Sequence, residues 1–208
     1  MKSIIICEGG TDLNLIEYFL EKTNGWGYKT DKKEIEIFKS VKNLNKNQDI
    51  LTIGESGGCT KIPKCFKSVI EKNKYSATDE ERFNNIVIIS DRDEIDTVDT
   101  FIKDLNNVLT DNGVDIEDRI IHDKWIMCKC LNGRGLEIQF RILLLIIPFE
   151  ETGALETFLL DAISKRDSYD KQIIEKGNYF VDTIDPQGKY LTKRRYFTKA
   201  KFDIYFSK

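Results

Sequence analysis

The stretch Ser3–Asp12, SIIICEGGTD, decides how the rest of the chain is interpreted. Its apolar residues, Ile4–Cys7, are typical of a short buried strand, and a glycine turn and a helical pattern follow them. We therefore expect Glu8 at the carboxyl end of this strand, where open α/β sheets place their ligands. The two glycines let the backbone approach a ligand closely. On this stretch alone, an ordinary strand-to-helix turn explains the same residues equally well.

The composition is that of a globular protein with one substantial core. The chain has 208 residues, of which 40% are hydrophobic and 32% charged, and its net charge is −3. This charge excludes a uniformly basic protein that binds polyanions over its whole surface. The 32 Lys and Arg residues are nevertheless enough to build a local basic patch, so nucleic acid stays a candidate partner.

The amino-terminal residues and the cysteines favour a cytoplasmic protein that does not bind membranes. The first residues, MKSIII, lack the apolar segment and cleavage site of a secretion signal. The longest apolar run, Ile142–Pro148, is far shorter than the ~20 residues of a membrane-spanning helix. An odd number of cysteines, five, with Cys7 in a core strand, favours reduced thiols. Cys128, Cys130 and the nearby His122 allow an incomplete zinc site, but strand cysteines explain their spacing better, and we assign His122 no role.

Three segments repeat the order strand, turn, helix. Their strands and helices are Ile4–Cys7 with Asp12–Lys22, Ile50–Ile53 with a helix beginning near Lys61, and Ile86–Ile89 with Val98–Leu109. Each turn is rich in glycine or acidic residues and lies at the same end of its strand. This order predicts right-handed crossovers and a Rossmann-like α/β fold with a central, mostly parallel sheet flanked by helices.

The other segments are less regular. We expect a short strand at Glu34–Phe38, a mobile polar loop at Lys39–Gln48, and two later strands, Trp125–Leu131 and Gln139–Pro148. A helix should follow Gly153, and another should lie near Asp170–Lys176 in the tail. The expected organisation is one α/β domain over residues 1–164 and a helical, basic extension, residues 165–208, packed on the same domain.

A second acidic turn offers carboxylates that could share a cation with Glu8. Asp91 and Asp93 follow the third strand and, being two residues apart, point the same way along an extended chain. Together with Glu8 they offer three carboxylates from neighbouring strands. Oxygen ligands without His or Cys suit Mg²⁺ or Mn²⁺ rather than zinc. Taken alone, Asp-x-Asp is more often a solvated turn, here with Asp96 as the helix cap.

These motifs together resemble the TOPRIM domain, which topoisomerases, bacterial primases, a ribosomal RNA maturation ribonuclease and OLD-family nucleases share. IIICEGGTD looks like the family's E-G-x-x-D turn, GESGGCTK resembles its middle glycine motif, and VIISDRDEID looks like its D-x-D. The resemblance covers roughly residues 3–112. The later segment IIPFEETGALETFLLDAI resembles part of small stand-alone TOPRIM-like proteins, with Glu156 as the acid that opens a helix.

The resemblance implies a divalent cation held by Glu8, Asp91 and Asp93, with Asp12 and Glu156 as candidates for a second one. It also implies phosphoryl-transfer chemistry, in which a pair of cations activates water and neutralises the leaving oxygen. The catalytic candidates are Glu8, Asp91 and Asp93. The tyrosine nucleophile of the topoisomerases has no recognisable counterpart, so strand passage is not expected.

Basic residues supply candidate phosphate contacts. Lys61 stands three residues after Gly58 at a helix start and is the fourth catalytic candidate, although a surface lysine explains it equally well. The tail segment YLTKRRYFTKAKF mixes lysine and arginine with aromatics, as nucleic-acid contacts require. An amphipathic terminal helix that packs its aromatics on the domain is the simpler interpretation.

The leading expectation is therefore a Mg²⁺- or Mn²⁺-dependent TOPRIM nuclease that hydrolyses DNA or RNA. The alternative is a non-catalytic TOPRIM-like subunit that binds nucleic acid or a nucleotide beside a partner ATPase, as relatives do in anti-phage systems. A purely structural protein is the third. The sequence leaves open DNA or RNA as the substrate and a homodimer as the assembly.

Overall fold

The computed structural model describes residues 1–92, 95–149 and 152–207. The chain forms two compact units: unit 1 comprises Met1–Ser90 and Asp96–Ile146, and unit 2 comprises Asp91–Ile95 and Ile147–Lys208. The division at Ile146 differs from the expected boundary at residue 164. None of the described helices is long and apolar enough to cross a membrane.

Unit 1 is built on an eight-stranded sheet with the order β2-β3-β4-β1-β5-β8-β7-β6. The strands are β1 (Lys2–Cys7), β2 (Gly27–Thr30), β3 (Ser40–Lys46), β4 (Asp49–Glu55), β5 (Asn85–Asp91), β6 (Asp115–Ile116), β7 (Trp125–Leu131) and β8 (Glu137–Ile147). The three strands of the expected strand-turn-helix repeats, β1, β4 and β5, are therefore present and lie together at the centre.

The α/β class is confirmed, but the sheet is mixed. β1 pairs in parallel with β4 and with β5, with Ile6 opposite Gly54 on one side and Ile88 on the other. The pairs β2–β3, β3–β4, β6–β7 and β7–β8 are antiparallel. A mostly parallel sheet is thus correct only for the three central strands, because the flanking strands are joined by hairpins rather than by crossover helices.

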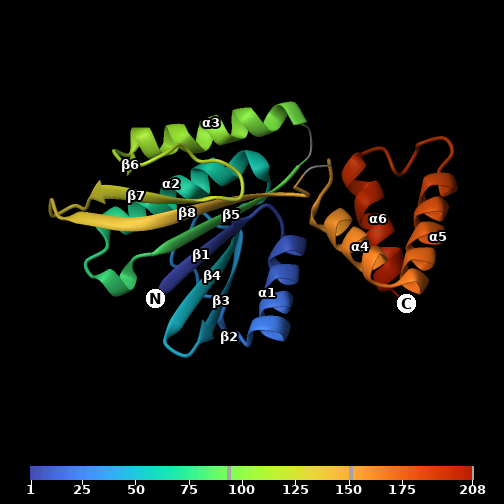
Figure 1. Cartoon of the computed structure of the whole chain (residues 1–208), viewed down its shortest axis with the longest axis horizontal. Helices are drawn as coiled ribbons and strands as arrows, with labels where there is room; N and C mark the ends of the chain where they lie inside the picture. Colours follow the sequence, from blue (N-terminus) through green and yellow to red (C-terminus); the bar gives the residue numbers. More distant parts are fainter. Residues whose placement is uncertain (93–94, 150–151, 208) are drawn as a thin grey trace. The chain divides into compact units, whose positions relative to one another are not determined.

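Two layers of helices cover the sheet of unit 1 (Figure 1). Helix α1 (Gly10–Asn24) lies over one face, where Leu13 packs with Leu44, Leu51 and Ile53. Helices α2 (Ile62–Tyr75) and α3 (Ile95–Asp111) cover the other face. As the sequence predicts, each of these helices follows a central strand: α1 follows β1, α2 follows β4 and α3 follows β5.

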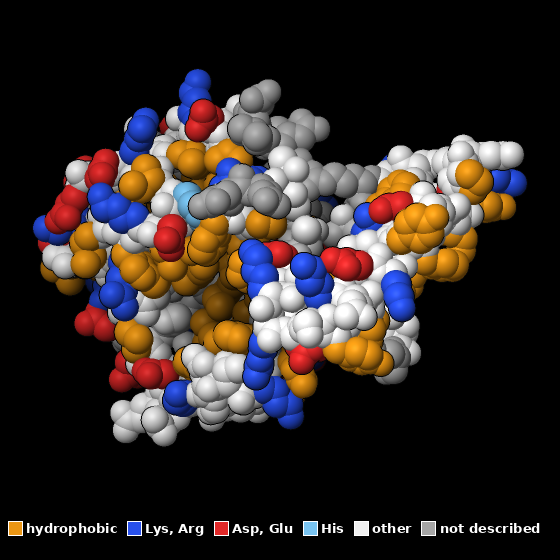
Figure 2. Space-filling view, turned by 45° about the vertical axis from the view of Figure 1, so that its right-hand side comes forward, with side chains coloured by type: hydrophobic (Ala, Val, Ile, Leu, Met, Phe, Trp, Pro, Cys, Tyr) orange, Lys and Arg blue, Asp and Glu red, His pale blue; other side chains and the backbone are white. Residues whose placement is uncertain are grey.

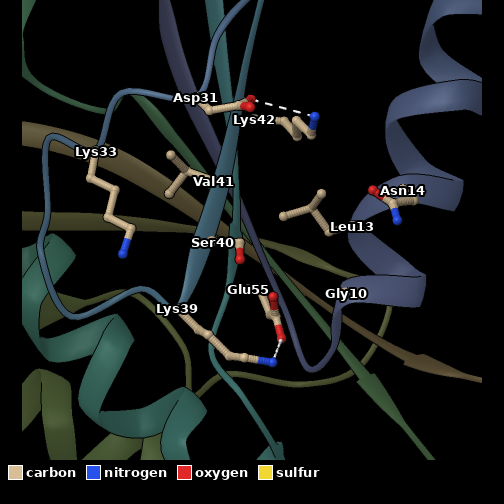
Figure 3. Close-up of a pocket in the computed structure, with 10 residues that line it drawn as sticks. All are labelled: Gly10, Leu13, Asn14, Asp31, Lys33, Lys39, Ser40, Val41, Lys42 and Glu55. Carbon is tan, nitrogen blue, oxygen red and sulfur yellow. Dashed lines mark hydrogen bonds and ion pairs between the residues drawn. The ribbon is translucent and has the colours of Figure 1, made fainter.

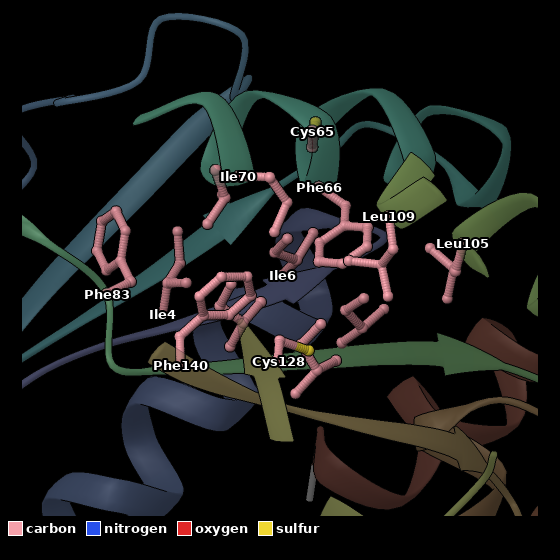
Figure 4. Packing of buried hydrophobic residues seen from close by; sticks show 14 of the residues in the cluster. Ile4, Ile6, Cys65, Phe66, Ile70, Phe83, Leu105, Leu109, Cys128 and Phe140 are labelled. Atoms are coloured by element: carbon pink, nitrogen blue, oxygen red, sulfur yellow. The ribbon is translucent and has the colours of Figure 1, made fainter. Parts of the chain in front are cut away.

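The larger core lies between the sheet and α2 and α3 (Figure 4). Fully buried Phe66 and Ile70 of α2 meet Ile4 and Ile6 of β1 in this cluster, and Leu105 of α3 joins it. β1 therefore has apolar side chains on both faces, as a strand covered on both sides requires. This burial holds the carboxyl end of β1 in a fixed position.

The segment before β4 differs from the expectation. Glu34–Phe38 is not a strand, and the residues expected to be a mobile loop contain β3, which pairs with β4 along its whole length. Phe38 is nevertheless buried in the larger core. The prediction was wrong because β3 is polar in composition, and its pairing partner rather than its own hydrophobicity makes it a strand.

Unit 2 contains three helices, α4 (Leu155–Arg166), α5 (Ser168–Ile184) and α6 (Arg194–Phe206), which pack on one another. Its buried residues include Leu160, Ile174, Val181 and Phe202. The side chain of Asp167 caps α5 by accepting hydrogen bonds from the backbone of Tyr169 and Asp170. Because α4 packs on α5 and α6, it belongs with the tail rather than with the sheet domain.

Candidate functional site

Glu8 stands where the first strand ends, and groups from β5 and from the turn after β4 hold it. Its carboxylate oxygen Oε1 accepts a hydrogen bond of 2.7 Å from the Ser90 hydroxyl of β5. Its backbone carbonyl accepts hydrogen bonds from the amides of Gly57 and Gly58, both at 2.9 Å. Its side chain is only half-buried. The carboxyl ends of β1, β4 and β5 thus meet around one partly accessible carboxylate.

The turn after β4 requires its two glycines. Gly57 has φ 83° and Gly58 has φ 130°, both in the region that L side chains rarely adopt. This conformation directs both amides at the Glu8 carbonyl. The Ser56 hydroxyl closes the turn by donating to the Gly58 carbonyl at 3.1 Å. The glycine motif therefore positions Glu8.

Lys61 lies beside this glycine turn, at the end of a short 3₁₀ turn, Cys59–Lys61, that precedes α2. A Cβ atom added to Gly57 would stand 3.5 Å from the Lys61 ammonium nitrogen. The lysine is exposed, and among the described residues its side chain has no hydrogen bond or ion pair, while its backbone amide donates to the Gly58 carbonyl at 3.0 Å. Glu8 and Lys61, which the sequence pairs as candidates, are thus attached to the same turn.

Asp12 has the helix-capping role that its position in α1 allows. It is buried, and its Oδ2 accepts a hydrogen bond of 2.9 Å from the Gly9 amide just before the helix. A carboxylate in the first turn also complements the helix dipole. One oxygen of this candidate ligand is therefore already engaged in holding the Gly-Gly turn.

Asp91 and Glu156 come together in unit 2. Asp91 Oδ1 accepts a hydrogen bond of 3.1 Å from the amide of Leu155, the first residue of α4. Glu156 is the next residue along the helix and is buried, with 4% of its surface exposed. The structure thus joins Asp91 to the first residue of α4, 64 residues further along the chain and next to Glu156. Asp93 lies outside the described residues.

Arg92, between the two aspartates of the motif, secures the same part of unit 2. Its side chain donates to the carbonyl oxygens of Pro148, at 2.8 Å, and of Phe149. Its backbone carbonyl accepts a hydrogen bond of 2.9 Å from Gly153. The start of α4 is therefore tied to the segment that contains Asp91.

The oxygen donors of these residues are of the kind that bind a divalent cation, but the described residues do not form a complete metal site by themselves. Among residues 1–92, 95–149 and 152–207, no three His, Cys, Asp or Glu side chains gather closely enough to hold a metal ion. Mg²⁺ keeps several waters and is commonly held by one or two carboxylates together with substrate phosphates. The half-buried carboxylate of Glu8, on the same glycine turn as Lys61, suits that kind of site.

Two supporting residues were missed from the sequence. Ser90, which orients Glu8, directly precedes Asp91, and a hydroxyl before an acidic pair was the available signal. Glu55 ends β4 in the glycine motif and is buried, with its carboxylate in a 2.9 Å ion pair with Lys39. Nothing in the local pattern of Lys39 indicated that pairing, because the two residues meet only through the β3–β4 hairpin.

The cysteines and the histidine of the later strands are structural. Cys128 and Cys130 are buried on β7, in the larger core. Burial, followed by the neighbouring Cys130, raises the pKa of the Cys128 thiol to about 12, so it is not a ready metal ligand. His122 accepts a hydrogen bond from the Ile146 amide at its Nδ1, at 3.0 Å. The expectation that Cys128 and Cys130 are buried strand cysteines is confirmed.

The basic tail forms the amphipathic terminal helix. Phe202 and Tyr205 of α6 are buried, and Lys201 makes a 2.7 Å ion pair with Asp182 of α5. Before the helix, the Lys189 ammonium lies 5.1 Å from the centre of the exposed Tyr190 ring. On the face shown in Figure 2, basic and acidic side chains are interspersed. The terminal helix is amphipathic, as expected, but its buried aromatics pack within unit 2, and Tyr190 and Tyr196 are exposed. Nucleic-acid contacts of the tail stay a prediction.

A family model described as "Protein of unknown function (DUF3226)" matches residues 2–208. The chain belongs to this family. No curated protein matches the chain. The DUF3226 chain is similar in structure to a hypothetical protein, PH0156, from Pyrococcus horikoshii OT3, with 19% identity, a TM-score of 0.53, and coverage of 99% of this chain and 88% of that one. This likeness shows a shared fold.

A weaker likeness of the DUF3226 chain is to a glyoxalase family protein from Enterococcus faecalis, with 13% identity and a TM-score of 0.24. It covers 67% of this chain and 94% of that one. A TM-score this low supports no inference about fold or chemistry.

Proposed function

We propose that this protein is a divalent-metal-dependent nuclease of the TOPRIM type, which hydrolyses phosphodiester bonds in DNA or RNA. One observation carries the proposal. The carboxylate of Glu8, at the end of the central strand, is hydrogen-bonded to Ser90, and Asp91 follows Ser90 directly in the chain. Glu8 directly follows β1, and Asp91 is the last residue of β5, the adjacent parallel strand.

The proposal gives each residue a distinct task. Glu8, Asp91 and Asp93 hold Mg²⁺ or Mn²⁺, with Asp12 and Glu156 available to a second ion. Lys61, exposed beside the glycine turn, binds the scissile phosphate. Ser90 holds the Glu8 carboxylate in place, and the Gly57 and Gly58 amides hold its backbone. The bound ion would polarise the phosphate and lower the pKa of a water ligand.

Hydrolysis itself breaks one phosphorus–oxygen bond. A water oxygen attacks phosphorus, the water loses a proton, and the leaving sugar oxygen gains one, so that a phosphomonoester and a free hydroxyl result. Glu8 is the candidate acceptor of the water proton because it is the partly accessible carboxylate of unit 1 that neighbours Lys61. Lys61 offsets the charge that develops on the phosphate.

A cleavage assay tests the proposal. Plasmid DNA, single-stranded DNA, tRNA and total RNA are incubated with the protein in Mg²⁺, in Mn²⁺ and in EDTA. We expect cleavage of at least one substrate that EDTA abolishes and that Glu8→Gln and Asp91→Asn each reduce by about 100-fold or more. Glu36→Gln, which removes an exposed carboxylate between β2 and β3, should cleave like the wild type.

Three results would overturn the proposed nuclease activity. They are no cleavage of any substrate, cleavage that continues in EDTA, and cleavage that Glu8→Gln leaves unchanged. Retained binding of nucleic acid without cleavage would instead favour the non-catalytic subunit beside a partner ATPase.

A further inference from the structure

A pocket of about 380 Å³ opens in unit 1 between the start of α1 and the strand β3 (Figure 3). Its walls include Gly10 of α1, Ser40 and Lys42 of β3, and Glu55 of β4. Lys33 and Lys39, from the segment between β2 and β3, also line it. This volume falls in the range of roughly 300–1,000 Å³ that small-molecule sites occupy.

Lysines dominate the polar lining of this pocket. Three of them face two carboxylates, Asp31 and Glu55. Both carboxylates are already paired: Glu55 with Lys39 at 2.9 Å, and Asp31 with Lys42 at 3.4 Å. Lys42 also lies 3.8 Å from Glu17, outside the lining. The two carboxylates of the lining are therefore paired with Lys39 and Lys42, two of its three lysines.

Lys33 is the lysine of this lining whose ammonium no described carboxylate pairs with. It is half-buried, and within the part of the chain that the structure describes it has no hydrogen bond or ion pair. Figure 3 shows its side chain extending along the pocket wall toward the side where Lys39 lies. Lys39 keeps 70% of its side chain exposed despite its bond to Glu55, so its ammonium can serve a second anion.

The pocket adjoins the turn that holds Glu8. Gly10 follows Glu8 by two residues, and Glu55 directly precedes the Ser56–Gly58 turn. A Cβ atom added to Gly57 would lie 3.7 Å from the Lys39 side chain and 3.5 Å from the Lys61 ammonium. Lys33 and Lys39 thus line the pocket, and Lys39 and Lys61 both lie beside the turn that holds the candidate catalytic carboxylate.

We infer that this pocket binds the phosphate group of a nucleotide through Lys33 and Lys39, with the Ser40 hydroxyl as an additional donor. The phosphate chemistry rests on the lysines alone, whereas the nucleotide as its carrier rests on the proposed nuclease function. Lysine ammonium groups bind phosphate as point charges, and each charge-assisted hydrogen bond is stronger than a neutral one. The first residue of α1 in the pocket wall adds the positive end of a helix dipole.

Calorimetric titration with AMP, in EDTA and at low salt, tests the inference without any cleavage step. We expect measurable binding that Lys33→Gln weakens about tenfold, the effect of losing one charge-assisted hydrogen bond. Lys32→Gln is the matched control, because Lys32 is an exposed neighbour with the same charge that does not line the pocket. Adenosine, which lacks the phosphate, should not bind.

A thymidine dinucleotide with and without a 5′-phosphate distinguishes a strand end from a free nucleotide. Binding of either the 5′-phosphorylated dinucleotide or AMP supports phosphate binding by the pocket if that binding depends on Lys33. The inference is overturned if AMP does not bind, if adenosine binds as tightly as AMP, or if Lys33→Gln and Lys32→Gln behave alike. The titration contains EDTA and involves no cleavage, so a failed nuclease assay and a failed binding test are separate outcomes. Glu36→Gln, which changes an exposed carboxylate outside the lining, should bind AMP like the wild type.

Discussion

At the residue scale, the least replaceable contact of the candidate site is the hydrogen bond from Ser90 to Glu8. Ser90 is buried, with 4% of its surface exposed, and donates at 2.7 Å. A bond of this kind fixes the orientation of the Glu8 carboxylate. The side chain that holds a metal ligand commonly matters nearly as much as the ligand.

We predict that Ser90→Ala lowers the Mg²⁺-dependent cleavage rate about tenfold while the free energy of unfolding changes by about 1 kcal/mol or less. Cleavage kinetics and urea unfolding of the same preparation check both parts. Ser68→Ala on α2 makes the same change at a serine whose hydroxyl has no hydrogen bond to a described residue. This variant should cleave like the wild type. An unchanged rate in Ser90→Ala would remove Ser90 from the site.

The sequence located Glu8, Asp91 and Lys61 because glycine and acidic residues interrupt apolar strands at recognisable points. It could not locate Ser90 or Glu55, because their roles depend on which strands are neighbours in the sheet. Asp12 was left between a metal-binding and a capping role, and its bond to the Gly9 amide shows the capping role.

At the scale of single elements, β3 shows how a polar sequence becomes a strand. Asn43 is buried in it, with 5% of its surface exposed, and donates to the carbonyl oxygens of Thr30 and Lys32, both at 2.9 Å. Its Oδ1 accepts a 2.7 Å hydrogen bond from Thr52 of β4. A pattern-based prediction treats such an asparagine as a turn residue, because the partners that satisfy it are distant in sequence.

We predict that Asn43→Ala destabilises the protein by about 1–3 kcal/mol, because it leaves the buried Thr52 hydroxyl and two partly buried carbonyl oxygens without their partner. Asn45→Ala, on an exposed position of the same strand, should cost about 0.5 kcal/mol or less. Urea unfolding monitored by circular dichroism measures both. Equal effects of the two substitutions would contradict the role assigned to Asn43.

The strand β7 gives the protein a dependence on alkaline pH. The pKa of Cys128 is raised from 9.0 to about 12 by burial and then by Cys130, so the folded state holds this proton more tightly than the unfolded state does. The stability that this provides is complete below pH 9 and is lost as the pH rises from 9 to about 12.

We therefore predict that over that alkaline range the free energy of unfolding falls more steeply with pH for the wild type than for Cys128→Ala. The difference in slope corresponds to at most about one proton per molecule, the proton that the Cys128 thiol keeps in the folded state. Chemical unfolding at several pH values measures the difference in slope. Cys59→Ala, at a partly exposed position, serves as the control and should follow the wild type. Parallel slopes for the wild type and Cys128→Ala would contradict the burial of this thiol.

At the scale of the whole molecule, the repeated order of strand, turn and helix was enough to predict the central strands β4, β1 and β5 with α1, α2 and α3. It was not enough to predict the antiparallel flanks, since hairpin pairing depends on partners and not on the repeat. It also placed α4 with the sheet domain. The apolar residues of α4, such as Leu160, instead pack with α5 and α6, which only the tertiary structure reveals.

The central claim is that Glu8 holds a divalent cation. Titration of the protein with Mn²⁺, followed by the loss of the electron paramagnetic resonance signal of free Mn²⁺, tests it most directly. We predict that the wild type and Glu36→Gln bind Mn²⁺ and that Glu8→Gln binds it at least about tenfold more weakly. A wild type that leaves all the Mn²⁺ free, or a Glu8→Gln protein that binds it like the wild type, would contradict the claim.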